Sequence, residues 1–335
     1  MDAAIRTEHL SRVYTTRDKA RRRIVALEDV NIEVQTGELF GVLGPNGAGK
    51  TTLIKILTTL LTPTSGRAWV LGYDVEREYR AIRPHINMVS GGETSGYGLL
   101  TVWENLWMFA QFYGLPWDVT RERIHTLARR IGLADRLRTK VSELSTGLRQ
   151  KANLIRGFLT DPQVLFLDEP TLGLDVQAAR DVREFIKEWM TEHPDRTIVL
   201  TTHYMPEAEE LCDRVAIIHK GRIIACDTPA HLKQRVQKAT IFRLEVTQRN
   251  GLSTAPLQSL PGVQRVWMRE TPQGARLDLY LDADDALMNV LQALTAQGAR
   301  ILSLEKRVPS LEDVFLHLVG EAWEAEEDAA KAARG

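Results

Sequence analysis

The segment Gly44-Pro45-Asn46-Gly47-Ala48-Gly49-Lys50-Thr51-Thr52 separates two apolar runs. Leu39–Leu43 precedes it, and residues at helical spacing follow it, namely Leu53, Ile56, Leu57 and Leu60. A strand, a glycine-rich turn and a helix in this order are the context that a phosphate-binding loop requires. In such a loop, backbone N–H groups converge on phosphate oxygens. Lys50 would neutralise the β and γ phosphates of a nucleotide, and Thr51 would supply a hydroxyl to Mg²⁺.

A second element ends in two carboxylates. The buried-type run Val164–Leu167 is followed by Asp168, Glu169 and Pro170. This arrangement can place Asp168 beside Mg²⁺ and leave Glu169 free to orient and deprotonate a water molecule. Acidic residues also end strands merely for solubility, so this element is weak evidence on its own. Together with the glycine-rich loop, it predicts a nucleotide hydrolase.

With three further motifs, the chain resembles the ATP-binding cassette (ABC) ATPases. Leu144–Gln150 is similar to the signature loop of that family, Leu172–Asp175 to its D-loop, and Thr201-Thr202-His203 to the segment with its switch histidine. Tyr14 stands where the family places an aromatic that stacks on adenine. The resemblance covers residues 5–235 and predicts an α/β P-loop fold, with a helical subdomain at about 95–160.

The resemblance also implies how the motifs would act. Two domains would pair head to tail, and each ATP would lie between the P-loop of one copy and the signature loop of the other. Ser145 and Gly147 would then contact the ATP held by the partner, at a helix N-terminus. His203 would contact the γ-phosphate, and Asp175 would serve the site as well as capping a helix. Residue by residue, Tyr14 could instead be an ordinary strand aromatic, and His203 a capping or core histidine.

Two motifs depart from the family pattern. Thr146 and Leu148 occupy positions where the signature loop usually has glycine and glutamine. The chain has no glutamine between Gln35 and Gln111, so the family's Q-loop glutamine is missing. Its expected position falls in Met88-Val89-Ser90-Gly91-Gly92-Glu93. Either Glu93 takes the metal-facing role, or the site turns over slowly.

Aromatic residues are concentrated just after this point. Seven of the 22 aromatics fall within 21 residues: Tyr97, Trp103, Trp107, Phe109, Phe112, Tyr113 and Trp117. Trp103 and Trp107 are four residues apart and would share one helix face. The segment could be the core of the helical subdomain. Alternatively, it could form an exposed aromatic groove that receives a short helix of a membrane partner, because aromatics are favoured at interfaces.

The pattern changes after residue 240. Phe242, Leu244 and Val246 alternate with Arg243 and Glu245, and the leucines at 277, 279 and 281 alternate with Asp278 and Tyr280, which predicts two half-buried strands. Further strands at Val263–Met268 and Ile301–Leu304, and a helix at Leu287–Leu294, predict a small α+β domain at 240–320 of β-α-β-β-α-β order. Ser310 and Asp313 form the cap signal of a closing helix. Residues 321–335 form an acidic tail. The domain resembles the accessory domain of ABC-2-type export ATPases.

Composition excludes several classes. With 335 residues, 44% apolar, 26% charged and a net charge of −1, the chain is typical of a globular protein and unlike one that coats nucleic acid. Its two cysteines, Cys212 and Cys226, exclude a disulfide framework. The longest apolar runs are far shorter than the ~20 residues that span a bilayer, and the N-terminus lacks a signal-peptide core.

We therefore expect an ATPase subunit, with ATP and Mg²⁺ as cofactors, that energises an ABC-2-type exporter. It would lie on the cytoplasmic face of the membrane, beside separate permease subunits and a second ATPase subunit, and would not bind nucleic acid. One alternative is a soluble ABC ATPase that acts on ribosomes or DNA, although such proteins typically carry two cassettes or a long coiled coil. Another is an ATP-binding regulatory subunit with little turnover. The transported substrate is not encoded in this chain.

Overall fold

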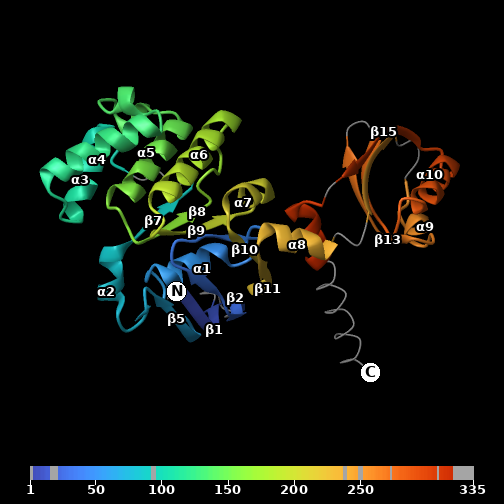
Figure 1. Ribbon diagram of the computed structural model, residues 1–335, viewed down its shortest axis with the longest axis horizontal. Helices are drawn as coiled ribbons and strands as arrows, with labels where there is room; N and C mark the ends of the chain where they lie inside the picture. Colours follow the sequence, from blue (N-terminus) through green and yellow to red (C-terminus); the bar gives the residue numbers. More distant parts are fainter. Residues whose placement is uncertain are drawn as a thin grey trace. The chain divides into compact units, whose positions relative to one another are not determined.

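The computed structural model describes residues 3–15, 22–91, 96–236, 240–247, 252–271, 274–307 and 309–319. The chain divides into two compact units, Met1–Pro229 and Ala230–Gly335 (Figure 1). We expected the first domain to extend to residue 235, but the division falls at the start of helix α8 (Pro229–Val236). The expected acidic tail at 321–335 lies outside the described residues.

A six-stranded sheet forms the centre of the first unit, in the order β11-β10-β4-β9-β8-β7. All neighbours are parallel except β10 and β11. Its strands are β4 (Leu39–Leu43), β7 (Ile86–Ser90), β8 (Val164–Asp168), β9 (Thr197–Thr202), β10 (Arg214–His219) and β11 (Arg222–Asp227). Every residue of β4, β8 and β9 is buried. Strands covered on both faces read as continuous apolar runs, so the expected α/β fold is confirmed.

A second, antiparallel sheet was not expected from the sequence. It has the order β2-β1-β5-β6, with β3 paired to β1. Its strands are β1 (Ala3–Thr15), β2 (Arg23–Val30), β3 (Glu33–Gln35), β5 (Ser65–Val70) and β6 (Tyr73–Asp74). Helix α1 (Lys50–Leu57) shares one apolar core with strands of both sheets. The helix ends before Leu60, which is 65% exposed, so Leu60 does not belong to its buried face as we expected.

Three helices pack together as a helical subdomain: α3 (Val102–Phe112), α4 (Trp117–Arg130) and α5 (Thr146–Leu159) (Figure 1). Thr101 and Glu104 form a capping box at the start of α3. The other helices of the first unit are α2 (Tyr79–Ile82), α6 (Val176–Glu192) and α7 (Met205–Leu211), with 3₁₀ turns at Arg83–His85, Ala134–Arg136 and Val141–Glu143. Within the described ranges, no helix is both long enough and apolar enough to cross a membrane.

The second unit contains an antiparallel sheet in the order β13-β14-β12-β15. Its elements follow the expected β-α-β-β-α-β order: β12 (Thr240–Thr247), α9 (Ala255–Gln258), β13 (Val263–Thr271), β14 (Gly274–Leu281), α10 (Ala286–Ala296) and β15 (Arg300–Arg307). The leucines expected to point inward on β14 are buried in its core. A closing helix at 311–319 begins with the expected cap, since the Ser310 N–H donates to Asp313 Oδ2 at 2.8 Å.

Candidate nucleotide-binding and hydrolysis site

The glycine-rich loop joins β4 to α1, as its sequence predicts. Gly49 precedes α1 with a φ of 113°, a conformation that glycine adopts far more readily than other residues. A Cβ atom there would lie 2.4 Å from the Ala26 carbonyl oxygen, and one at Gly44 would lie 2.3 Å from the Ile218 carbonyl oxygen. Both glycines are therefore required by close backbone packing, which holds the loop in place between β2 and β10.

Lys50 is buried and is held from three directions. Its Nζ donates hydrogen bonds to the carbonyl oxygens of Gly44 at 2.8 Å and Pro45 at 3.2 Å. It also forms a 3.1 Å ion pair with Glu169 Oε1. A buried ammonium group needs such partners, because burying an unpaired charge is costly. The lysine charge is thus fixed between the loop and Glu169, the residue that directly follows β8.

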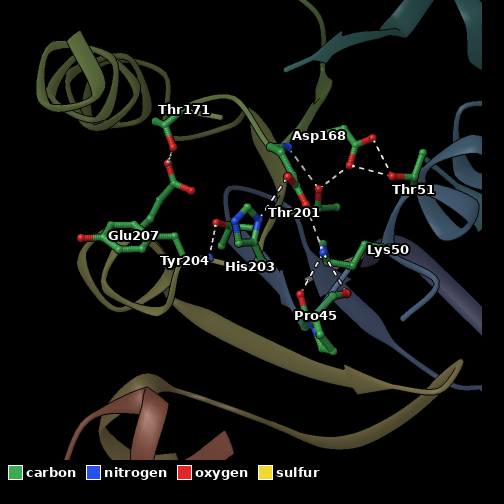
Figure 2. A network of polar contacts seen from close by, with 12 residues as sticks. Pro45, Lys50, Thr51, Asp168, Thr171, Thr201, His203, Tyr204 and Glu207 are labelled. Atoms are coloured by element: carbon green, nitrogen blue, oxygen red, sulfur yellow. Dashed lines mark hydrogen bonds and ion pairs between the residues drawn. The ribbon is translucent and has the colours of Figure 1, made fainter. Parts of the chain in front are cut away.

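Thr51 and Asp168 lie side by side, as the resemblance implies for a metal site. The Thr51 hydroxyl donates to Asp168 Oδ2 at 3.0 Å, and the Thr201 hydroxyl donates to Asp168 Oδ1 (Figure 2). A hydroxyl and a carboxylate are oxygen ligands of the kind that Mg²⁺ prefers, with the remaining positions taken by phosphates and water. In the described part of the chain, no cluster of three or more acidic, histidine or cysteine side chains could bind a metal alone. The residues therefore fit a magnesium ion that arrives with a nucleotide.

Glu169 connects the loop lysine to the switch histidine. Its Oε1 pairs with Lys50, and its Oε2 lies 3.1 Å from His203 Nδ1. Its backbone has a φ of 51°, which non-glycine residues rarely adopt. The Glu169 N–H donates to the Thr201 carbonyl oxygen at 3.0 Å. The expected carboxylate and histidine therefore lie together at the ends of β8 and β9.

A cavity of about 170 Å³ opens over the loop, and its walls are Ala26, Asn46, Gly47, Gly49, Lys50, Thr51, Thr52 and Glu169. Tyr14, the expected adenine-stacking residue, is not among these walls. It lies on β1, where the Arg12 guanidinium sits 4.9 Å from the centre of its ring. Contact between Tyr14 and adenine stays a prediction.

The signature loop forms the start of α5 rather than a wall of this cavity. Ser145 is the N-cap residue of α5, and its hydroxyl accepts a 3.3 Å hydrogen bond from the Leu148 N–H. Gly147 packs near Ala178 of α6. Neither Ser145 nor Gly147 lines the cavity over the loop. Within one chain, the two halves expected to enclose ATP are therefore separate.

The segment after the carboxylates turns into α6. Asp175 caps that helix, because its Oδ1 accepts a 2.8 Å hydrogen bond from the Ala178 N–H.

Gly91 approaches the other side of the site, and its N–H donates to the Asp168 carbonyl oxygen at 2.7 Å. A Cβ atom on Gly91 would lie 1.8 Å from the Glu169 carbonyl oxygen. Glu93, the expected substitute for the Q-loop glutamine, lies outside the described residues.

The sequence matches the ABC transporter family over residues 27–172. It matches the DrrA1-3-like ATP-binding protein C-terminal domain over residues 228–319. It is also 33% identical to the linearmycin resistance ATP-binding protein LnrL of Bacillus subtilis, over 90% of this chain and 96% of that protein. This chain belongs to the ABC transporter ATP-binding proteins.

Other comparisons agree with that assignment. The daunorubicin resistance ATP-binding protein DrrA3 of Streptomyces coeruleorubidus is 35% identical over 91% of this chain and 94% of that protein. A solved ATP-binding subunit of an ABC transporter is 31% identical and covers 70% of this chain and 93% of its own, with a TM-score of 0.61. As a member of this family, the chain binds ATP and is an ATPase, so the expected fold, family and enzyme class are confirmed.

The geometry shows what each group of this ABC ATPase can do. Lys50 lies where it can neutralise phosphate charge, and Thr51 with Asp168 can bind a metal. Glu169 lies within reach of the same loop and can accept a proton from water. His203, 41% exposed at its side chain, can donate a hydrogen bond into the site.

The aromatic segment forms an exposed surface on α3 and the start of α4. Trp107, Phe112, Tyr113 and Trp117 are exposed, and Phe112 is 69% exposed. Trp103 and Trp107 share a helix face as expected, since both rings meet Trp117 edge-on, at 6.3 and 6.5 Å. None of the seven aromatics is buried, so the interpretation of this segment as core is wrong for these side chains. The buried face of α3 consists of Val102, Asn105, Leu106 and Ala110.

Three contacts of the site could not be found from sequence. The Thr201 hydroxyl contacts Asp168, whereas the motif Thr201-Thr202-His203 predicts a role for His203 alone. The Gln150 amide donates to the Pro170 carbonyl oxygen at 2.9 Å. Glu207 accepts a hydrogen bond from Thr171. Each joins segments far apart in sequence, and the local pattern around these residues contains no signal for such pairs.

Proposed function

We propose that this ATPase energises a membrane exporter of the ABC-2 type. The observation that carries the proposal is the match to a linearmycin resistance and a daunorubicin resistance ATP-binding protein, over more than nine-tenths of the length of each. The match to a DrrA-like C-terminal domain supports it. The transported molecules would be drugs, lipids or other small molecules, and the translocation path would belong to separate permease subunits. The chain would act at the cytoplasmic face of the membrane.

The separation of the two half-sites supports a head-to-tail dimer. The cavity over the glycine-rich loop has no wall from Ser145 or Gly147 of the same chain. These residues stand instead at the N-terminus of the 14-residue helix α5, where backbone N–H groups and the helix dipole favour an anion. A second copy would bring its Ser145 to the γ-phosphate held by Lys50. Two chains would then enclose two ATP molecules.

Hydrolysis would follow from the positions of the described side chains. Lys50 would bind the phosphates, and Glu169 would orient water and accept its proton. His203, at present 3.1 Å from Glu169 Oε2, would stabilise charge that develops at the γ-phosphate. Mg²⁺ bound by Thr51 and Asp168 would supply charge neutralisation. Closure of the dimer on ATP and its opening after hydrolysis would drive the permease.

The exposed aromatic surface supports docking to the permease. Soluble proteins rarely expose a large apolar patch without a partner. Trp107 and Trp117 contact each other edge-on, and Phe112 contacts Phe109, while Trp107, Phe112, Tyr113 and Trp117 are all exposed. Aromatic side chains of this kind are typical anchors of protein interfaces. We therefore place the permease contact on α3 and the start of α4.

The test is co-purification of the chain with a polytopic membrane protein, followed by identification of what the complex transports. Trp107→Glu should abolish assembly and transport but spare ATP binding by the free subunit. Tyr73→Glu is a matched control, because Tyr73 is similarly exposed but lies in the separate antiparallel sheet. A folded Trp107→Glu variant that still assembles and supports transport would move the docking site elsewhere. Purification without any membrane protein would contradict the exporter function.

A further inference from the structure

Helix α7 contains a buried carboxyl group close to the turn that carries His203. Glu207 is 1% exposed, and its Oε1 accepts a 2.8 Å hydrogen bond from the Thr171 hydroxyl (Figure 2). Its Oε2 is also buried and makes no hydrogen bond of normal geometry within the described residues. A buried carboxyl group carries a desolvation cost, which is tolerated only where its contacts serve the structure or the function.

The hydrogen bond joins two segments that border the catalytic residues. Thr171 begins the turn into α6, since its carbonyl oxygen accepts a 3.2 Å hydrogen bond from the Leu174 N–H. Glu207 lies in the first turn of α7, and its N–H donates to the Tyr204 carbonyl oxygen at 3.1 Å. Tyr204 directly follows His203 in the chain. The carboxyl group therefore links the turn before α6 to the turn that carries the histidine.

Apolar packing does not fill the space between these two segments. A cavity of about 290 Å³ lies between them, lined on one side by Leu172 and Leu174 and on the other by His203 and Tyr204. Leu172 and Tyr204 are exposed. Close packing normally fixes the relative position of neighbouring elements, and here a cavity occupies that place. The Thr171–Glu207 hydrogen bond is a direct polar contact between the two turns beside this cavity, whereas the ion pair of Arg183 with Glu210 joins the helices α6 and α7 that follow them.

We propose that Glu207 is a positioning residue for ATP hydrolysis. Through Thr171, it fixes the Leu172–Asp175 loop relative to the His203 turn, so that a shift of the loop is transmitted to the histidine beside Glu169. The carboxyl group does not touch the nucleotide itself. The inference rests on ATP hydrolysis at the site described above, and it is independent of which membrane protein the subunit serves.

The experiment compares four variants of the full chain: Glu207→Ala, Glu207→Gln, Thr171→Val and the double variant Thr171→Val/Glu207→Ala. Turnover and KM for ATP, affinity for labelled ATP, and thermal stability are measured for each. Glu184→Gln is the matched control, because Glu184 is an exposed carboxylate that, among the described residues, pairs only within α6, with Arg180, and does not bridge to α7. Glu169→Gln serves as the reference for loss of catalysis.

We expect Glu207→Ala to lower kcat about 10-fold or more while KM and ATP affinity stay near wild type, because small displacements of catalytic groups are costly in rate. Glu207→Gln keeps an oxygen for Thr171 and should retain activity within about twofold, whereas Thr171→Val should behave like Glu207→Ala. The double variant should be no slower than either single variant, because both remove the same contact. Glu184→Gln should match the wild type.

Several results would overturn the proposal. A Thr171→Val variant with wild-type kcat would do so even if Glu207→Ala failed to fold. Equal losses in Glu207→Ala and Glu207→Gln, accompanied by lower thermal stability and weaker ATP binding, would show that the carboxyl group only supports the fold. Normal hydrolysis by Glu169→Gln would instead show that Glu169 is not the general base. That result would contradict the proposed hydrolysis mechanism, on which the inference rests, rather than the role of Glu207.

Discussion

Gln150 and Pro170 are joined by a 2.9 Å hydrogen bond from a side-chain amide to a backbone carbonyl. Gln150 is buried on α5, the helix that the signature loop begins, and Pro170 directly follows Glu169. The helix that would act on a partner's ATP is thereby tied to the segment that carries the carboxylate proposed as the general base of this chain. A movement of α5 would therefore be transmitted to Glu169 through Pro170, the residue next to it.

We expect Gln150→Leu to destabilise the first unit by about 1–3 kcal/mol, because the Pro170 carbonyl would be left buried without its donor. Urea denaturation followed by tryptophan fluorescence measures the change. Gln111→Leu is the control, since Gln111 is exposed on α3, and surface substitutions usually cost less than about 0.5 kcal/mol. Equal stability of the two variants would show that the Pro170 carbonyl finds another donor.

Replacement of Glu169 by Gln should separate binding from catalysis. Turnover should fall by about 10²-fold or more, because a positioned general base contributes roughly that factor. Affinity for labelled ATP should stay near the wild-type value. Hydrolysis at a near-normal rate would exclude Glu169 as the base.

Lys50→Ala should weaken ATP binding itself, since it removes the buried charge beside the glycine-rich loop. Equilibrium titration with labelled ATP measures the loss. Lys55→Ala, an exposed position on the same helix, should bind ATP like the wild type. Unchanged affinity in Lys50→Ala would show that the nucleotide phosphates bind elsewhere.

Glu207 should make stability depend on pH. Burial raises the pKa of its carboxyl group above the ordinary value of 4.5, although the hydroxyls of Thr202 and Thr171 and the charges of Arg183 and His203 oppose this. The folded protein therefore binds this proton more tightly than the unfolded chain, and stability falls as pH rises from about 4.5 through the folded-state pKa.

Glu207→Gln cannot ionise, so its melting temperature relative to the wild type should increase with pH across that window. Thermal scans of both proteins at several pH values measure the difference. A difference that stays constant with pH would mean that Glu207 has an ordinary pKa in the folded protein.

The C-terminal unit allows a test of its closing helix. The Tyr280 hydroxyl donates a 3.0 Å hydrogen bond to Asp313, which is buried and also accepts from Ser310. Tyr280→Phe should cost about 1 kcal/mol, the typical net value of one such bond. Amide exchange in residues 311–319 should then accelerate about fivefold, as that free energy implies. The control Tyr73→Phe, in the other unit, should leave this exchange unchanged. Unchanged exchange in Tyr280→Phe would contradict the prediction and show that apolar contacts alone hold the helix.

Local patterns predicted the elements that carry their own signal. The glycine-rich loop has a strand before it and a helix after it, and Asp168 ends a continuous apolar run, so both were found at the ends of parallel strands. The inward-facing leucines of β14 followed from simple alternation. In each case, one segment contains the whole pattern.

Other features depend on which distant segments meet. β1 pairs with β2, β3 and β5, and nothing within residues 3–15 specifies those partners or a separate sheet. The exposure of Trp107 was one of two open alternatives, because helical spacing shows that two rings share a face and not whether another helix covers it. Gln150, Thr201 and Glu207 gain their roles only from tertiary contacts.

The ion pair between Lys50 and Glu169 means that phosphates bound at Lys50 would compete with a carboxylate for the same positive charge. In the proposed mechanism, this competition would free an oxygen of Glu169 to contact water. Nucleotide binding would then itself make the proposed proton acceptor available.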